Sequence, residues 1–340
     1  MPYRDLSLDY IKGMLILLVV YGHCLYWLDG SNNTSVYYFI PKIIYTFHMP
    51  LFIFLSGYFF ASKATGSFYQ TTTEKFKRLI IPHLFFNIIM IIPIFLFWEQ
   101  YGHFITREMP SGTISLKSIY HYFTMFWYLW CVFFSCIITN CTCILMKRHA
   151  NITLIGIALL LLFLSKNPPT LVFFEHQQMG RMFFYFVLGK ILYNKISLFT
   201  RLPIVICSTF IYLLYILCIE VFQYDNTYIT EIGNMVGLIC AFNFFLFLYK
   251  HNIFTRYLCN ISKYTLGIYI YHFVILYTIM AWFNTHITIS GLSLSFLHII
   301  TAIVTIALVK AFISLLKHSD FFRIYALGEK QSGKNQISTS

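Results

Sequence analysis

Residues 9–28, DYIKGMLILLVVYGHCLYWL, determine the structural class of this protein. Most of these side chains are apolar, and Lys12 and His23 are the main interruptions. A helix needs about 20 mostly apolar residues to cross the hydrocarbon core of a bilayer. The stretch therefore predicts a membrane-spanning helix. Because Lys12 interrupts it and no small-residue cleavage site follows, we interpret it as a retained helix and not as a signal peptide.

The composition of the whole chain agrees with this interpretation. Of its 340 residues, 59% are hydrophobic and 11% are charged, whereas a soluble domain carries about 25% charged residues. The net charge of +12 is also compatible with nucleic-acid binding. The basic residues, however, fall in short clusters between long apolar runs, which favours a membrane protein without a nucleic-acid partner. The nine cysteines fall mostly within apolar runs and are interpreted as small core residues.

The same length criterion predicts an all-α, polytopic membrane protein with about ten transmembrane helices. The predicted segments are 9–28, 37–61, 80–98, 120–145, 150–165, 178–194, 202–222, 229–249, 264–283 and 293–316. Residues 1–327 then form one membrane domain. The polar residues 328–340 predict a disordered tail.

The distribution of basic residues predicts the orientation of these helices. With a cytoplasmic N-terminus, 19 of the 24 Lys and Arg residues fall on the inner side, as the positive-inside rule requires. The five exceptions are Lys42, Arg107, Lys117, Lys166 and Arg181. Both termini are therefore expected to be cytoplasmic. A strongly basic inner face suits anionic lipid, and it also suits a cytoplasmic donor that carries phosphates.

Two histidines are predicted to lie at similar depth in the membrane. Lys12 and His23 are eleven residues apart, which places them on one helix face and about 16 Å apart along the axis. His48, on the second predicted helix, lies at the same depth as His23 when counted from the inner side. An imidazole can take up and return a proton near neutral pH, as general base catalysis requires. A snorkelling lysine and a packed histidine are the alternative. No third ligand is suitably spaced for zinc, so no metal is expected.

Four other residues are candidates because of their position. His272 lies in the middle of segment 264–283, where it is either functional or a core residue. Arg181 begins segment 178–194 near the outer side, where it either binds an anionic substrate or snorkels. Lys75 and Arg78 precede the third helix and share a face if this stretch is helical. They then either hold phosphates or only mark the topology.

Six stretches of the chain resemble motifs of one family. They are RDLSLDYIKGMLILLVVYGH (4–23), FHMPLFIFLSGYFF (47–60), KFKRLIIPH (75–83), WYLW (127–130), GRMFFYFVLGKIL (180–192) and SKYTLGIYIYHF (262–273). Together and in this order, they resemble the acyltransferase 3 family of integral membrane acyltransferases, and most closely its fucose 4-O-acetylase-like group.

The resemblance implies a ten-helix domain with acyl-CoA, commonly acetyl-CoA, as the cytoplasmic donor. It also implies an acceptor hydroxyl on a cell-surface glycan, or on its lipid-linked precursor, at the outer face. By position, His23 matches the catalytic histidine and Lys12 its basic partner, while Lys75 and Arg78 match a paired-arginine motif. Lys75 stands where the family usually has arginine, which keeps the charge but not the bidentate geometry.

The sequence thus predicts an O-acyltransferase of the bacterial inner membrane. His23 is the expected general base, and Lys12, Lys75 and Arg78 are expected to bind the donor. His48, Trp127, Arg181 and His272 are candidate substrate-binding residues. The alternative is a polytopic transporter that exports a glycan or its precursor. Transporters often carry internal repeats or helices broken in matching halves, and the sequence has neither.

The predicted orientation can be tested with a topology reporter. A reporter fused after Ser340 is expected to be active in the cytoplasm, because most basic residues fall on that side. Activity restricted to the outer side would contradict the ten-helix topology.

Overall fold

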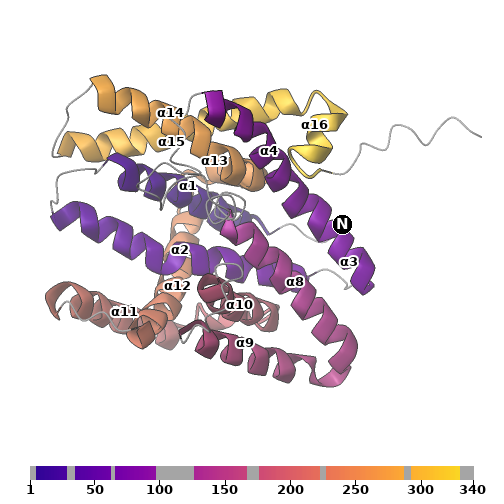
Figure 1. The fold of residues 1–340 in the computed structure, drawn as a ribbon. Coiled ribbons are helices and arrows are strands. Elements are labelled where there is room, and N and C mark those ends of the chain that lie inside the picture. Colours follow the sequence, from indigo (N-terminus) through magenta and orange to yellow (C-terminus); the bar gives the residue numbers. More distant parts are fainter. Residues whose placement is uncertain are drawn as a thin grey trace, which may run out of the picture.

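The computed structural model of the chain describes residues 5–28, 35–62, 66–96, 126–166, 176–222, 227–286 and 292–329 (Figure 1). Within these ranges the chain is helical and contains no strand. Residues 120–125 of the fourth predicted segment and 330–340 of the predicted tail lie outside them.

Each of the ten predicted segments coincides with a long helix. These helices are α1 (Leu6–Leu28), α2 (Ser35–Ala61), α4 (Ile81–Leu96), α8 (Trp127–Met146), α9 (Ala150–Lys166), α10 (His176–Ile191), α11 (Leu202–Phe222), α12 (Thr227–Lys250), α14 (Thr265–His286) and α15 (Leu292–Leu316). Six stretches of the described chain are long and apolar enough to cross a membrane by length and composition alone. The prediction of an all-α, polytopic membrane protein is therefore confirmed.

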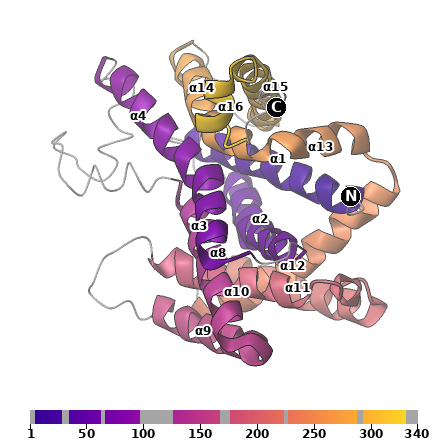
Figure 2. The same ribbon diagram turned by 90° about the vertical axis from the view of Figure 1, so that its right-hand side faces the viewer.

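Short helices surround one end of this array. They are α3 (Phe68–Lys75), the π-helix η1 (Phe76–Ile80), α13 (Thr255–Ile261) and α16 (Asp320–Tyr325), together with the 3-10 turns η2 (Lys147–His149), η3 (Ile196–Leu198) and η4 (Ser262–Tyr264). Figure 1 shows α3, α16 and the junction of α8 with α9 at this end, whereas α1 ends and α2 begins at the opposite end. Figure 2 shows the array from this side, which is the predicted cytoplasmic side.

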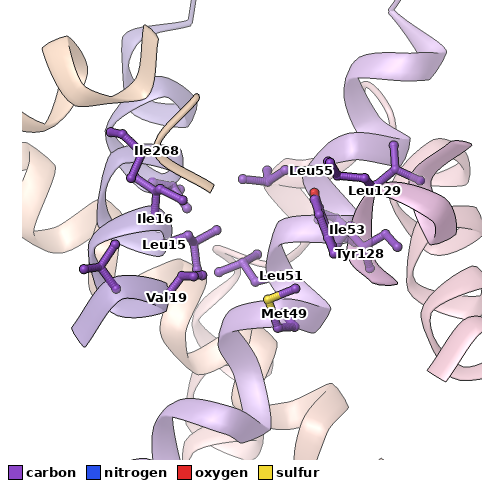
Figure 3. Packing of buried hydrophobic residues seen from close by; sticks show 14 of the residues in the cluster. Leu15, Ile16, Val19, Met49, Leu51, Ile53, Leu55, Tyr128, Leu129 and Ile268 are labelled. Carbon is purple, nitrogen blue, oxygen red and sulfur yellow. The ribbon is translucent and has the colours of Figure 1, made fainter. Parts of the chain in front are cut away.

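Helix α1 is largely enclosed by other helices. Its apolar side chains, such as Leu15, Ile16 and Val20, are fully buried and belong to the main core cluster. Figure 3 shows Leu15 and Val19 of α1 close to Leu51 of α2. In the apolar stretch of α1, 67% of the residues are buried inside the protein, compared with 11% in the apolar stretch of α11. Helix α11 therefore presents apolar side chains to lipid, whereas α1 is enclosed by protein and can hold polar residues.

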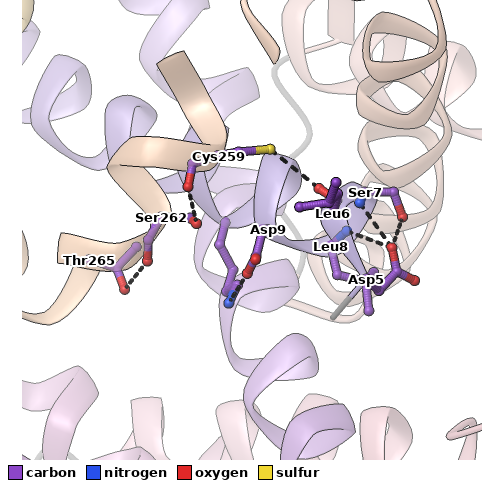
Figure 4. A network of polar contacts seen from close by, with 9 residues as sticks. Asp5, Leu6, Ser7, Leu8, Asp9, Cys259, Ser262 and Thr265 are labelled. Carbon is purple, nitrogen blue, oxygen red and sulfur yellow. Dashed lines mark hydrogen bonds and ion pairs between the residues drawn. The ribbon is translucent and has the colours of Figure 1, made fainter. Parts of the chain in front are cut away.

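The start of α1 is fixed by a local cap. The Asp5 carboxylate accepts hydrogen bonds from the backbone N–H groups of Ser7 (2.9 Å) and Leu8 (3.4 Å). These N–H groups have no acceptor within the helix, and a capping side chain contributes about 1 kcal/mol. Figure 4 shows Asp5 beside this first turn, with Asp9 one turn further along. The cap sets the register of the helix that carries Lys12 and His23.

Glycine allows α2 and α10 to pack with their backbones in contact. A Cβ added to Gly57 of α2 would overlap the carbonyl oxygen of Phe186 in α10. A Cβ added to Gly189 of α10 would overlap the carbonyl oxygen of Phe54 in α2. Small residues at such contacts are typical of helix pairs in membranes, where close packing replaces the hydrophobic effect.

This contact predicts a large difference between two glycine substitutions. Gly57→Ala should destabilise the protein by about 1–3 kcal/mol, because the added methyl group overpacks a backbone contact. Gly156→Ala in α9 is the control, since nothing lies within 4 Å of its added Cβ, and it should be neutral or slightly stabilising. Thermal melting of both variants in detergent is the measurement. Equal melting temperatures would contradict the close packing of α2 and α10.

Candidate functional site

Lys12 is held from two directions. Its Nζ lies 2.6 Å from the carboxylate of Asp9, one turn earlier in α1, and 4.6 Å from the centre of the Phe59 ring in α2. The Asp9 side chain is only 6% exposed. A buried carboxylate needs a cationic partner, so Lys12 neutralises Asp9 while its ammonium group stays partly exposed. Sequence reasoning did not single out Asp9, although its i, i+3 spacing from Lys12 was visible.

The second predicted donor residue lies beside the first. Lys75, the last residue of α3, places its Nζ 5.5 Å from the centre of the Phe60 ring in α2. Because Phe59 and Phe60 are consecutive, Lys12 and Lys75 flank the same end of α2. The fold thus places two cations from separate sequence motifs at the same, predicted cytoplasmic end of α2.

Arg78 lies on the π-helix η1 and is exposed. A π turn pairs residues i and i+5 and is wider than an α turn. The angle between Lys75 and Arg78 therefore differs from the one that α-helical spacing predicts. Isolated π turns often occur at functional sites, so this local geometry fits a binding motif, although it does not identify the ligand.

His23 of α1 is in ring contact with His272 of α14. The two ring centres are 5.3 Å apart, and the Phe273 ring lies 5.0 Å from that of His23. His272 is buried, and its Nδ1 lies 2.8 Å from the carbonyl oxygen of Ile268. A carbonyl only accepts hydrogen bonds, so Nδ1 carries the proton in the neutral ring and Nε2 is the basic nitrogen. This Nε2 has no hydrogen-bond partner in the described part of the chain.

His48 lies in a different environment. Its Nδ1 is 2.7 Å from the carbonyl oxygen of Ile44, and its ring packs on that of Tyr45 at 4.9 Å. Both partners belong to α2, the helix of His48 itself. The sequence predicted that His48 lies at the same depth as His23, which would allow the two to share a site. Within the described ranges, the histidine in ring contact with His23 is His272.

Aromatic residues connect the histidine pair to α8. The Tyr269 ring lies 6.2 Å from that of His272 and 5.4 Å from that of Tyr128. The Tyr128 hydroxyl is 3.0 Å from the Ser56 hydroxyl of α2. Trp127 is half-buried at the start of α8, with its ring 6.3 Å from that of Tyr128. Tyr269 precedes His272 by three residues, so helical spacing alone could have indicated it.

Arg181 forms an ion pair inside the protein. Its guanidinium contacts the carboxylate of Glu231 at the start of α12, and Tyr185 donates a hydrogen bond to the same carboxylate at 3.0 Å. The side-chain amide of Asn234 makes two hydrogen bonds of 3.0 Å in the orientation that pairs both of its polar atoms. Its oxygen accepts from Nη2 of Arg181, and its nitrogen donates to the Thr46 carbonyl oxygen. Arg181 therefore joins α10 to α12, and Glu231 already balances its charge. This argues for a structural role beside the predicted substrate contact.

The acidic and histidine residues do not gather into a metal site in the part of the chain that the structure describes. No group of three or more His, Cys, Asp or Glu side chains meets there. The polar residues instead form three separate groups. Lys12 and Lys75 lie at one end of α2, the His23–His272 pair lies between α1 and α14, and the Arg181–Glu231 pair lies between α10 and α12.

Two curated proteins are similar to part of the chain. The nodulation protein NolL of Sinorhizobium fredii is 34% identical over 141 residues, which is 40% of this chain and 36% of that protein. NolL of Mesorhizobium japonicum is 35% identical over 140 residues, which is 40% of this chain and 35% of that protein. The alignments thus cover about a third of the length of these relatives. No solved structure matches the chain.

A family model described as an acyltransferase domain matches residues 5–314. The match includes α1 with Lys12 and His23, the motif at Lys75 and Arg78, and α14 with His272. It extends over most of the 340 residues. The chain therefore belongs to this acyltransferase family.

Proposed function

We propose that this protein moves an acetyl group from cytoplasmic acetyl-CoA to a hydroxyl of a cell-surface glycan or of its lipid-linked precursor. The observation that carries the proposal is the contact between His23 and His272, which places a second imidazole against the histidine of the first motif. Membership of an acyltransferase family favours group transfer over the alternative of glycan export. The two relatives are bacterial proteins, and the location proposed for this protein is a bacterial inner membrane.

The donor would bind at the end of α2, beside Lys12 and Lys75. Acetyl-CoA carries several phosphates, and ammonium and guanidinium groups bind phosphate through charge-assisted hydrogen bonds. Lys12, Lys75 and Arg78 supply three such groups at the predicted cytoplasmic end. His23 lies eleven residues beyond Lys12 on one face of α1, about 16 Å further into the membrane. The pantetheine arm of a donor bound at Lys12 would extend along this helix towards His23.

His23 would act as the general base for transfer. It accepts the proton of the acceptor hydroxyl while the hydroxyl oxygen attacks the thioester carbonyl. The C–S bond then breaks, and the proton passes from the imidazolium to the departing thiolate. The ester and free CoA are the products, and His23 returns to its neutral form. An imidazole is suited to both proton transfers at neutral pH.

His272 would orient His23 and share the proton. Its Nδ1–H donates to the Ile268 carbonyl, so this ring is held with Nε2 as an acceptor. A neighbouring acceptor of this kind stabilises an imidazolium. On the acceptor side, His48, Trp127 and Arg181 remain predictions, and the ion pair with Glu231 makes Arg181 the weakest of the three.

Substitution of His23 tests the proposed base. His23→Ala and His23→Gln should each lower acetyl transfer by roughly 10²–10⁴-fold, because neither side chain can take up the proton. His83→Gln is the control, since His83 is bonded to Asn87 at 3.0 Å and has no part in the proposed proton transfer. Transfer is measured with labelled acetyl-CoA and a glycan extract, and melting is recorded for each variant. Near-normal transfer by His23→Gln would remove this residue from the mechanism.

Removal of two cations tests the donor site. Lys75→Ala combined with Arg78→Ala should weaken acetyl-CoA binding and leave folding intact, because the Arg78 side chain is exposed and that of Lys75 is only half-buried. The difference from wild type should shrink at high salt, where screening weakens the wild-type site. Lys147→Ala with Arg148→Ala is the control, since these two basic residues are exposed at the same end of the array. If the two double variants bind acetyl-CoA with equal affinity, Lys75 and Arg78 only mark the topology and do not bind the donor.

A further inference from the structure

The chain after α15 folds back onto the proposed site. We call residues 317–329 the C-terminal segment; it includes α16 and follows directly after the end of α15. This segment lies beyond residues 5–314, which match the family model. In Figures 1 and 2, α16 lies close to α4, and the two helices are in contact. The segment thus contacts family motifs although it is outside the family match.

One end of the C-terminal segment contacts the donor motif through its backbone. Gly328 has φ +62°, a conformation that favours glycine. A Cβ added to Gly328 would overlap the carbonyl oxygen of Arg78 in the π-helix η1. Two separate requirements therefore select glycine here, namely the left-handed backbone and the absence of a side chain. Gly328 and Glu329, which the sequence assigned to the tail, are packed against the protein.

The same segment is bonded to the helix that carries His272. The Tyr271 hydroxyl donates a hydrogen bond of 3.0 Å to the carbonyl oxygen of Ala326, and both residues are buried. Tyr271 immediately precedes His272 in α14. Its ring also packs on that of Phe86 in α4, at 5.5 Å. Two residues of the segment, Ala326 and Gly328, thus connect α14 to the backbone of Arg78.

Ion pairs and aromatic contacts hold the segment in place. The Glu329 carboxylate bridges Lys317 at 2.8 Å and Arg323 at 3.5 Å. These pairs are partly exposed, so each contributes little. The Phe85 ring of α4 packs against three rings of α16. These rings are Phe321 at 5.9 Å, Phe322 at 6.3 Å and Tyr325 at 6.4 Å. The segment is therefore docked mainly by aromatic packing and by its buried residues.

We propose that the C-terminal segment fixes the donor motif relative to α14, so that Gly328 and Tyr271 are positioning residues for acyl transfer. This inference rests on the proposed function, in which the Lys75 motif binds the donor and α14 supports His23. Bound phosphates are sensitive to the position of the cations that hold them. A shift of the Arg78 backbone should therefore weaken donor binding even though every charge is retained.

Gly328→Ala tests this inference directly. The added methyl group must displace the Arg78 backbone, so acetyl-CoA should bind about tenfold more weakly, which corresponds to about 1.4 kcal/mol. Gly156→Ala is the matched control, because its methyl group meets nothing within 4 Å. Acetyl-CoA binding is measured on the purified full-length chain in detergent, together with melting.

A double-mutant cycle separates positioning from general damage. In the Lys75→Ala, Arg78→Ala background the charged side chains are gone, so adding Gly328→Ala should cause no further loss of acetyl-CoA affinity. The same loss in both backgrounds, or unchanged affinity of Gly328→Ala alone, would overturn the inference. Unchanged affinity of the Lys75→Ala, Arg78→Ala protein itself would overturn the proposed donor site, and with it this inference.

Tyr271→Phe provides a second variant in case Gly328→Ala fails to fold. It removes only the hydroxyl that donates to Ala326 and retains the ring that packs on Phe86. We expect acetyl-CoA affinity to fall about threefold and the melting temperature to fall slightly, because one buried hydrogen bond is lost. Wild-type affinity in this variant would overturn the link between the segment and α14.

Discussion

A charged side chain inside a bilayer must be neutralised by a partner, and this constraint determines where the polar residues of this protein lie. Asp9 and Lys12 satisfy it within one turn of α1, and Arg181 and Glu231 satisfy it between two helices. An unpaired charge at such a position costs several kcal/mol. Each pair therefore fixes the helices around it, and α1 can occupy the centre of the fold because its one lysine is balanced.

The two lysines at the end of α2 illustrate how such charges would serve the proposed donor site. Lys12 and Lys75 each lie over a phenylalanine ring, an interaction that contributes about 0.5–1 kcal/mol at exposed sites. The rings hold the ammonium groups in place without forming hydrogen bonds to them. The N–H groups that do not face Asp9 remain available for an anionic ligand. A site that is ordered before binding loses less entropy when the ligand arrives.

The helices were predictable from the sequence because apolar length reports directly on a membrane span. The position of Lys12 and His23 on one face of α1 also follows from helical spacing. Helical spacing did not predict that the ring in contact with His23 belongs to His272. Counting residues gives the depth of His48 and His272 but not which helix faces α1, because the neighbours of a helix depend on contacts between distant segments. The role of Glu231 was missed for the same reason, because its partner Arg181 lies on another helix. Asp9 was missed although its partner Lys12 lies on the same helix, since hydropathy treats Asp9 only as an interruption.

The backbone contact between α2 and α10 restricts how the molecule can move. Gly57 and Gly189 bring main-chain atoms together at two points, so no change of side-chain rotamer can separate these helices. Any opening that admits a large acceptor must therefore arise at interfaces built from long side chains, which can slide and repack. α2 also carries the rings that hold Lys12 and Lys75. The proposed donor site at this end of α2 would therefore keep its position relative to α10.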